Sequence, residues 1–92
     1  MNKVINGKRY NTETAKQIAE WTNAYHVLGV LDAVWETIYR KRTGEYFLHG
    51  IGGPRTQYAR ALNDGSVCQG EMIVPLTHEE AMAWAKDHNR SL

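Results

Sequence analysis

The sequence predicts an α+β fold, in which a small antiparallel β-sheet, made of a central hairpin and one or two further strands, packs against two or three helices. Period-two alternation of aromatic and β-branched residues in 34–50 indicates paired strands. An Asn-Gly pair in 4–10 indicates a second hairpin, and a Thr-x-x-Glu motif at 77–80 indicates a helix start. A chain of 92 residues supports one modest core, so we expect a single domain over 1–92.

The central hairpin is predicted over Val34 to Gly50. On the first strand, three residues alternate with three others: Trp35, Thr37 and Tyr39 with Glu36, Ile38 and Arg40. On the second strand, Tyr46 and Leu48 alternate with Phe47 and His49. Gly44 can adopt the positive φ that closes the loop 41–44. Because an isolated hairpin is marginal in water, we expect its aromatic side chains to share one dry interior with the indoles of Trp35 and Trp84.

The N-terminal third predicts a hairpin and then a helix. Asn6-Gly7 favours a type I′ turn between two short strands in 4–10. Asn11 or Thr12 can cap a helix that ends near Thr22, because Ala15, Ile18, Ala19 and Trp21 or Thr22 form one apolar stripe. For Asn23 to Ala33 the pattern leaves two alternatives open, a loop that tucks inward and a short helical turn.

The C-terminal half predicts helix, strand and helix. After Gly50 to Pro54, which form a corner, Pro54 suits the first turn of a short helix over 56–62, and 63–66 ends it. Glu71 to Pro75 is a strand. Thr77 and Glu80 then form a capping box for a helix from His78 to about His88, with Leu76 at the staple position and one apolar face: Ala81, Trp84, Ala85 and His88.

Composition indicates a soluble globular protein of a reducing cytoplasm. The chain is 42% hydrophobic, has neither a signal-peptide region nor an apolar run of membrane-spanning length, and contains one cysteine, Cys68. The formal charge of +1 gives no global field toward nucleic acid, so direct nucleic-acid binding is not expected. We expect a monomer that does not bind membranes.

No motif indicates catalysis. His26, His49, His78 and His88 lack metal-ligand spacing and are expected at surface or partly buried positions. Gly50-Ile51-Gly52-Gly53 lacks the Lys-Ser/Thr of a P-loop and is more typical of a tight strand-to-helix connection. Neither Cys68 nor Ser66 has an assignable base. We therefore expect no enzyme activity, no cofactor and no metal.

The charged residues suggest two docking surfaces of opposite sign. The acidic candidates are Asp64, Glu71, Glu79, Glu80 and Asp87. The basic candidates are Arg40, Lys41, Arg42, Arg55 and Arg60, to which Lys8 and Arg9 add on the first hairpin. Separated charges of both signs favour a charged protein partner, whereas tyrosine and arginine together can also bind nucleic acid. A solvated hairpin tip without a partner is the third alternative.

Three blocks of the chain resemble one family: 5–15 (INGKRYNTETA), 36–54 (ETIYRKRTGEYFLHGIGGP) and 73–81 (IVPLTHEEA). It is a family of small single-domain proteins of bacteria, phages and other mobile elements, and the resemblance extends to anti-CRISPR proteins that act on type I surveillance complexes, type I-C among them. It implies stoichiometric binding to the complex (Cascade) and a block of target-DNA recognition, with no catalytic motif.

This chain departs from the many anti-CRISPR proteins that are markedly acidic, because it is nearly neutral. The expected mechanism is therefore steric occlusion or DNA mimicry by a local acidic face. The alternative function is a small nucleic-acid-binding accessory protein of a mobile element that uses the basic hairpin tip.

Overall fold

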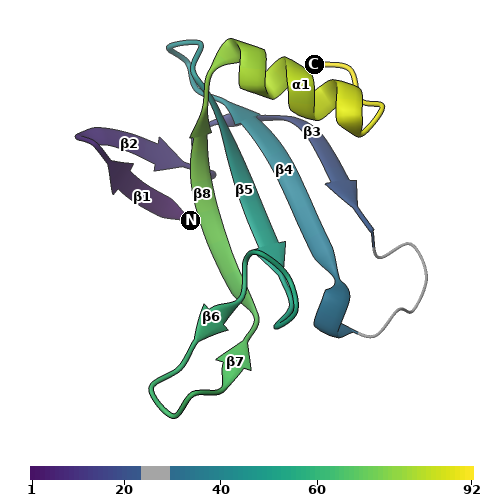
Figure 1. The fold of residues 1–92 in the computed structure, drawn as a ribbon. Helices are drawn as coiled ribbons and strands as arrows, with labels where there is room; N and C mark the ends of the chain where they lie inside the picture. Colours follow the sequence, from purple (N-terminus) through teal and green to yellow (C-terminus); the bar gives the residue numbers. More distant parts are fainter. Residues whose placement is uncertain (24–29) are drawn as a thin grey trace.

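A computed structural model describes residues 1–23 and 30–92 (Figure 1). The strands are β1 (Asn2–Ile5), β2 (Lys8–Asn11), β3 (Lys16–Thr22), β4 (Val34–Arg40), β5 (Tyr46–Gly52), β6 (Arg60–Ala61), β7 (Val67–Cys68) and β8 (Gly70–Leu76). The helical elements are a 3-10 turn, η1 (Val30–Asp32), and α1 (His78–Asp87), the one α-helix in the described residues. None of the described helices is long and apolar enough to cross a bilayer.

The fold is organised around a four-stranded antiparallel sheet in the order β3-β4-β5-β8. Ile38, Leu48 and Val74 face one another across β4, β5 and β8. In Figure 1, α1 crosses one end of this sheet, the β1-β2 hairpin lies at its side, and the β6-β7 hairpin projects from the opposite end. Arg90 closes the C-terminal segment onto the edge strand β3, because its Nε donates to the Glu20 carbonyl oxygen at 2.8 Å.

Two apolar clusters cover opposite faces of the sheet. Beneath α1, Ile38 and Leu48 pack against Trp84 and Ala85. On the other face, Tyr10 of β2 packs against Phe47 and Ile73. Successive strand residues point to opposite faces, so the neighbours Phe47 and Leu48 belong to different clusters.

The predicted single dry interior is therefore wrong. Trp84 is buried as expected, but Trp35 points away from α1 and is 42% exposed. The two indoles lie on different faces because Trp35 is next in sequence to Glu36, which hydrogen-bonds to Trp84 at 2.9 Å.

Elements with local sequence signals are confirmed. Asn6 and Gly7 have φ of 52° and 77° in the β1-β2 turn, and Gly44 has φ of 94° in the β4-β5 loop. Thr77 and Glu80 form both hydrogen bonds of the capping box at the start of α1. The strand predicted over Glu71 to Pro75 is β8.

Two predicted helices are wrong, so one α-helix replaces the expected two or three in the described residues. Asn11 ends β2, residues 12–22 form a turn and β3, and the stretch over 56–62 forms a loop and β6. Gly50 and Gly52 lie within β5 instead of forming a strand-to-helix connection. In Asn23 to Ala33, the described part contains η1, and residues 24–29 lie outside the described residues.

Candidate functional site

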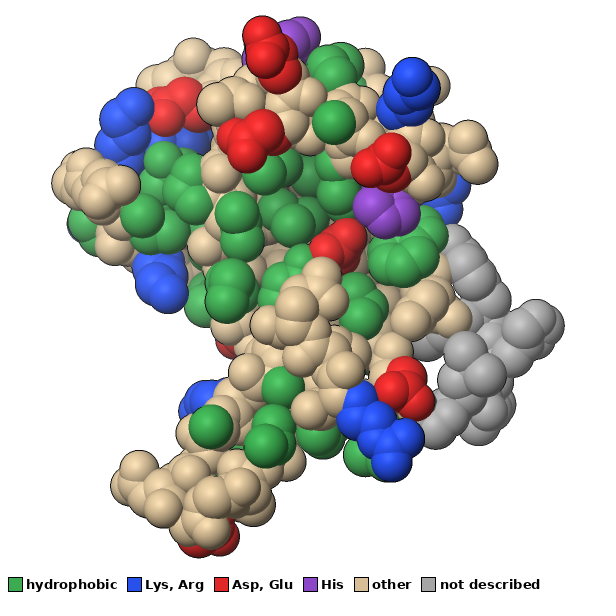
Figure 2. Space-filling view, viewed as in Figure 1, with side chains coloured by type: hydrophobic (Ala, Val, Ile, Leu, Met, Phe, Trp, Pro, Cys, Tyr) green, Lys and Arg blue, Asp and Glu red, His purple; other side chains and the backbone are tan. Residues whose placement is uncertain are grey.

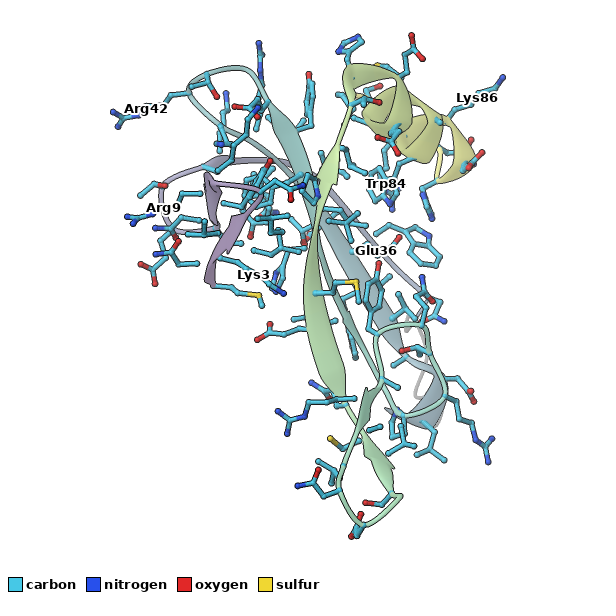
Figure 3. The ribbon with its side chains drawn as sticks, turned by 60° about the vertical axis from the view of Figure 1, so that its left-hand side comes forward. Lys3, Arg9, Glu36, Arg42, Trp84 and Lys86 are labelled. Carbon is cyan, nitrogen blue, oxygen red and sulfur yellow. The ribbon has the colours of Figure 1, made fainter. Side chains whose placement is uncertain are left out.

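A buried carboxylate lies at the centre of the α1 face. Glu36 is only 6% exposed. Its Oε1 accepts a hydrogen bond from the Trp84 indole nitrogen at 2.9 Å, and its Oε2 accepts one from the Tyr58 hydroxyl. Figure 3 shows Glu36 and Trp84 directed toward each other from β4 and α1. Because a buried carboxylate without donors is very costly, these two hydrogen bonds hold three distant segments together.

Three glycines make room for Tyr58. A β-carbon at Gly50 would lie 2.1 Å from the Tyr58 ring carbon Cζ, and one at Gly70 would lie 2.1 Å from the Tyr58 carbonyl oxygen. A β-carbon at Gly52 would lie 2.1 Å from the Thr56 hydroxyl. Any side chain at these positions would lift the loop off the sheet. The Gly-rich stretch therefore functions in packing, by letting residues 53–59 lie flat on β5 and β8.

His88 completes this cluster at the end of α1. Its ring lies between the Trp21 and Trp84 rings, with centroid distances of 4.4 and 4.6 Å. Nδ1 is 2.8 Å from the Trp84 carbonyl oxygen and must carry a hydrogen to donate to it. Nε2 lies 3.8 Å from Glu36 Oε1. The histidine thus joins the β3 edge to the Glu36 hydrogen bonds.

The cluster of Glu36, Tyr58, Trp84 and His88 holds α1 and the loop before β6 on the sheet. Burial, followed by the hydrogen bond to Glu36, raises the pKa of the Tyr58 hydroxyl, which therefore keeps its proton. In the described residues, no buried side-chain nitrogen or oxygen lacks a hydrogen-bond partner, and no group of three or more metal-ligating side chains is found. Each Glu36 oxygen accepts a hydrogen bond, and the arrangement positions α1 on the sheet.

The predicted acidic residues do not form one face. Glu79, Glu80 and Asp87 lie on α1 and are exposed. Glu71 lies on the sheet face opposite α1, where its Oε2 is 2.8 Å from His49 Nε2. Asp64 lies in the β6-β7 turn, where hydrogen bonds from the Ser66 hydroxyl and amide lower the pKa of its carboxyl. Figure 2 shows acidic side chains over α1.

The predicted basic residues divide into two groups. Arg40, Lys41 and Arg42 lie at the β4-β5 tip. Arg55 and Arg60 lie toward the other end of the sheet, where Arg55 is 4.0 Å from the Asp32 carboxylate. The tip also contacts the first hairpin, since Lys41 Nζ is 4.4 Å from the centre of the Tyr10 ring.

The remaining candidates lie apart. His78 is exposed and its ring centroid is 5.8 Å from that of Tyr46, whereas His49 and His88 are partly buried, as expected. His26 lies outside the described residues. Cys68 is a partly buried free cysteine on β7, and the Ser66 hydroxyl donates to Asp64 within a turn. His49, His78, His88, Cys68 and Ser66, the candidates that the structure describes, converge on no common site.

Sequence reasoning missed the Glu36 cluster. Its partners lie 22 and 48 residues away, at Tyr58 and Trp84. The available signal was the position of a glutamate between Val34 and Ile38, two residues from each on the same strand face. Comparison of the chain with protein-family models, curated proteins and solved structures found no match. The functional proposals rest on the arrangement of its residues and on the three-block resemblance.

Proposed function

We propose that this chain is a non-catalytic inhibitor that binds a type I CRISPR-Cas surveillance complex (Cascade) in the cytoplasm of a bacterial host and blocks recognition of target DNA. The resemblance of 5–15, 36–54 and 73–81 to the phage and mobile-element family supports it. The observation that supports it most directly is the exposed acidic side of α1.

Two carboxylates on α1 have no counter-ion within the described part of the chain. Glu79 and Asp87 are exposed and make no hydrogen bond or ion pair with any residue in 1–23 or 30–92. They are eight positions apart, which is about 12 Å along a helix that rises ~1.5 Å per residue. Glu80 lies near them and accepts a hydrogen bond from the Thr77 amide at 2.9 Å. Such carboxylates can accept hydrogen bonds from the basic groups of a DNA-binding site.

The helix that presents these carboxylates is held rigidly. Trp84 binds Glu36, His88 packs between two indoles, and the Thr77 cap fixes the first turn. A preorganised surface loses less conformational entropy when it binds, which favours affinity.

The placement of the acidic residues favours occlusion together with local DNA mimicry. Asp64 and Glu71 are remote from α1, so only three carboxylates are available on the helix to replace phosphates. The body of the protein would then block the DNA path sterically.

The decisive experiment mixes the purified protein with a purified type I Cascade. We expect co-elution in gel filtration and loss of the electrophoretic shift of target DNA. An unaltered DNA shift at molar excess of the protein rejects the proposal.

Variants on α1 test the docking surface. Reversing both Glu79→Lys and Asp87→Lys should weaken binding to Cascade by about 30-fold or more, since one lost charge-assisted contact of ~2 kcal/mol has that effect. Glu80→Gln removes a charge but keeps an acceptor for the Thr77 amide. It therefore distinguishes the effect of the charge on binding from the effect of the capping box on helix stability. Glu13→Lys, on the exposed β2-β3 turn, is the matched charge reversal. If Glu13→Lys abolished binding while the α1 variants still bound, α1 would be excluded as the docking surface.

A further inference from the structure

One end of the molecule is strongly basic, although the net charge of the chain is near zero. Residues 8–16 and 40–45 contain six of the eleven basic side chains and only two of the ten acidic ones. The basic residues are Lys8, Arg9, Lys16, Arg40, Lys41 and Arg42, and the acidic ones are Glu13 and Glu45. These segments meet where the β1-β2 hairpin approaches the β4-β5 tip, as the ion pair of 3.2 Å between Lys8 and Glu45 shows. Basic side chains gather at that end in Figure 2.

A groove of about 370 Å³ lies between these two hairpins. Arg9 and Asn11 of β2 and Thr14 of the following turn line one wall, and Lys41, Arg42 and Thr43 line the other. The Asn11 side-chain oxygen accepts from the Glu13 amide at 2.9 Å, and its NH₂ group has no acceptor in the described residues. The groove thus combines a neutral donor with three cations.

Two of those cations are uncompensated. Lys41 is 3.5 Å from Glu45, which also binds Lys8. Arg9 and Arg42, by contrast, make no hydrogen bond or ion pair with any side chain or backbone group that the structure describes. Figure 3 shows both pointing away from the sheet on the side opposite Lys86. A guanidinium group presents a planar set of N–H donors that matches phosphate oxygens.

Two more cations lie at the same end of the molecule, outside the groove and on the α1 face of the sheet. Lys16 and Arg40 are directly opposite each other on β3 and β4, and both are exposed. Like charges directly opposite each other destabilise a sheet. The Arg40 guanidinium lies 5.8 Å from the Tyr46 ring centre, and no carboxylate of the described residues is within ion-pair distance of either residue. Together with the three cations of the groove, they make this end of the molecule positive on both faces, which fits a ligand with repeated negative charges.

We propose that this basic groove binds the phosphate backbone of single-stranded nucleic acid, DNA and RNA alike. Repeated phosphates match several separate cations at this end better than a single anion does. The Tyr10 ring is buried and Lys41 covers it, so it offers bases no platform for stacking, and binding is independent of sequence. A flexible single strand can bend its phosphates toward cations on both sides of the hairpin tips, whereas a duplex holds its phosphates at fixed positions on a wide convex surface. This inference is independent of docking on Cascade.

The test is fluorescence anisotropy with labelled mixed-sequence single strands of about 15 nucleotides, within the ~4 to 16 that small single-strand-binding domains cover. We expect similar affinities for DNA and RNA. A plot of the logarithm of the association constant against the logarithm of the salt concentration should have a slope of about −0.7 for each phosphate engaged. The double variant Arg9→Ala with Arg42→Ala should bind at least tenfold more weakly. Its slope should be smaller in magnitude by about 1.4, because two phosphate contacts are lost. Neither side chain has a partner to lose, so circular dichroism should show an unchanged fold.

Lys86→Ala, on the opposite side, is the matched control and should leave nucleic-acid binding unchanged. The proposal is overturned by the absence of binding at low salt, by equal binding of the double variant, or by tighter binding of duplex DNA or polyglutamate than of single strands. None of these results bears on Cascade binding through α1, because the two sets of variants share no residue.

Discussion

The contact between Gly50 and Tyr58 gives a sharp test of how the loop is held on the sheet. In an ordinary strand Gly→Ala is favourable by ~0.5–1 kcal/mol. Here the added methyl group would lie 2.1 Å from Tyr58 Cζ, so the ring must leave its place. Displacement of the Tyr58 ring breaks its hydrogen bond to the buried Glu36 carboxylate, worth ~1.5–3 kcal/mol, and exposes apolar ring surface. We expect Gly50→Ala to lower the free energy of unfolding by about 3 kcal/mol or more.

The same substitution should be nearly harmless once the ring is gone. Tyr58→Leu removes the ring atoms that the new methyl group would meet. In that background we expect Gly50→Ala to cost less than about 1 kcal/mol, an interaction energy of roughly 2 kcal/mol between the two sites. The assay is urea unfolding of the four proteins, followed by circular dichroism and tryptophan fluorescence. Val4→Ala, at a position 60% exposed, should have the same small effect in both backgrounds. Equal costs of Gly50→Ala in the two backgrounds would refute the packing argument.

Two further predictions concern pH and helix capping. The raised pKa of Tyr58 means that the folded state keeps a proton that the unfolded chain loses above about pH 10, so stability should fall as pH rises further, by up to ~1.4 kcal/mol per unit. Urea unfolding at increasing pH should show this extra decline in the natural protein and not in Tyr58→Phe, and identical declines would contradict it. Thr77→Ala should lower the free energy of unfolding by ~1 kcal/mol, because it removes the acceptor for the Glu80 amide, and Thr77→Ser should lower it much less. Equal thermal melts of the two variants would exclude the cap as a stabilising contact.

The parts of the fold that follow from the sequence are those set by neighbouring residues. Asn6-Gly7 determines its turn through positive φ, and Thr77 with Glu80 determines the start of α1 through two local hydrogen bonds. Neither signal depends on the rest of the chain, so both predictions are confirmed.

The prediction of a helix over 11–22 failed because a β-bulge imitates a helical pattern. Gln17 pairs with Tyr39 and Ala19 with Ile38, so Ile18 is an extra residue in β3. Both Ile18 and Ala19 pack against the cluster beneath α1. Adjacent apolar residues on one face are usual in a helix and occur in a strand at a bulge.

The candidate sites needed tertiary structure for a different reason. The burial of Glu36 depends on donors from a loop and a helix far along the chain, and the basic groove depends on Arg9 meeting Arg42 across two hairpins. The sequence indicated which charges exist. It could not indicate that Asp64 and Glu71 lie apart from α1, because that separation depends on which sheet face α1 covers and on where the β6-β7 hairpin lies.

The arginine that binds the Glu20 carbonyl has a consequence for solubility. β3 and β8 are the two rims of the sheet, and an open rim can recruit a strand from another molecule. Arg90 occupies an outward carbonyl of one rim, and Pro75 removes an amide from the ladder of the other. Strand addition is thereby disfavoured on both sides, so neither rim readily recruits a strand from a second molecule.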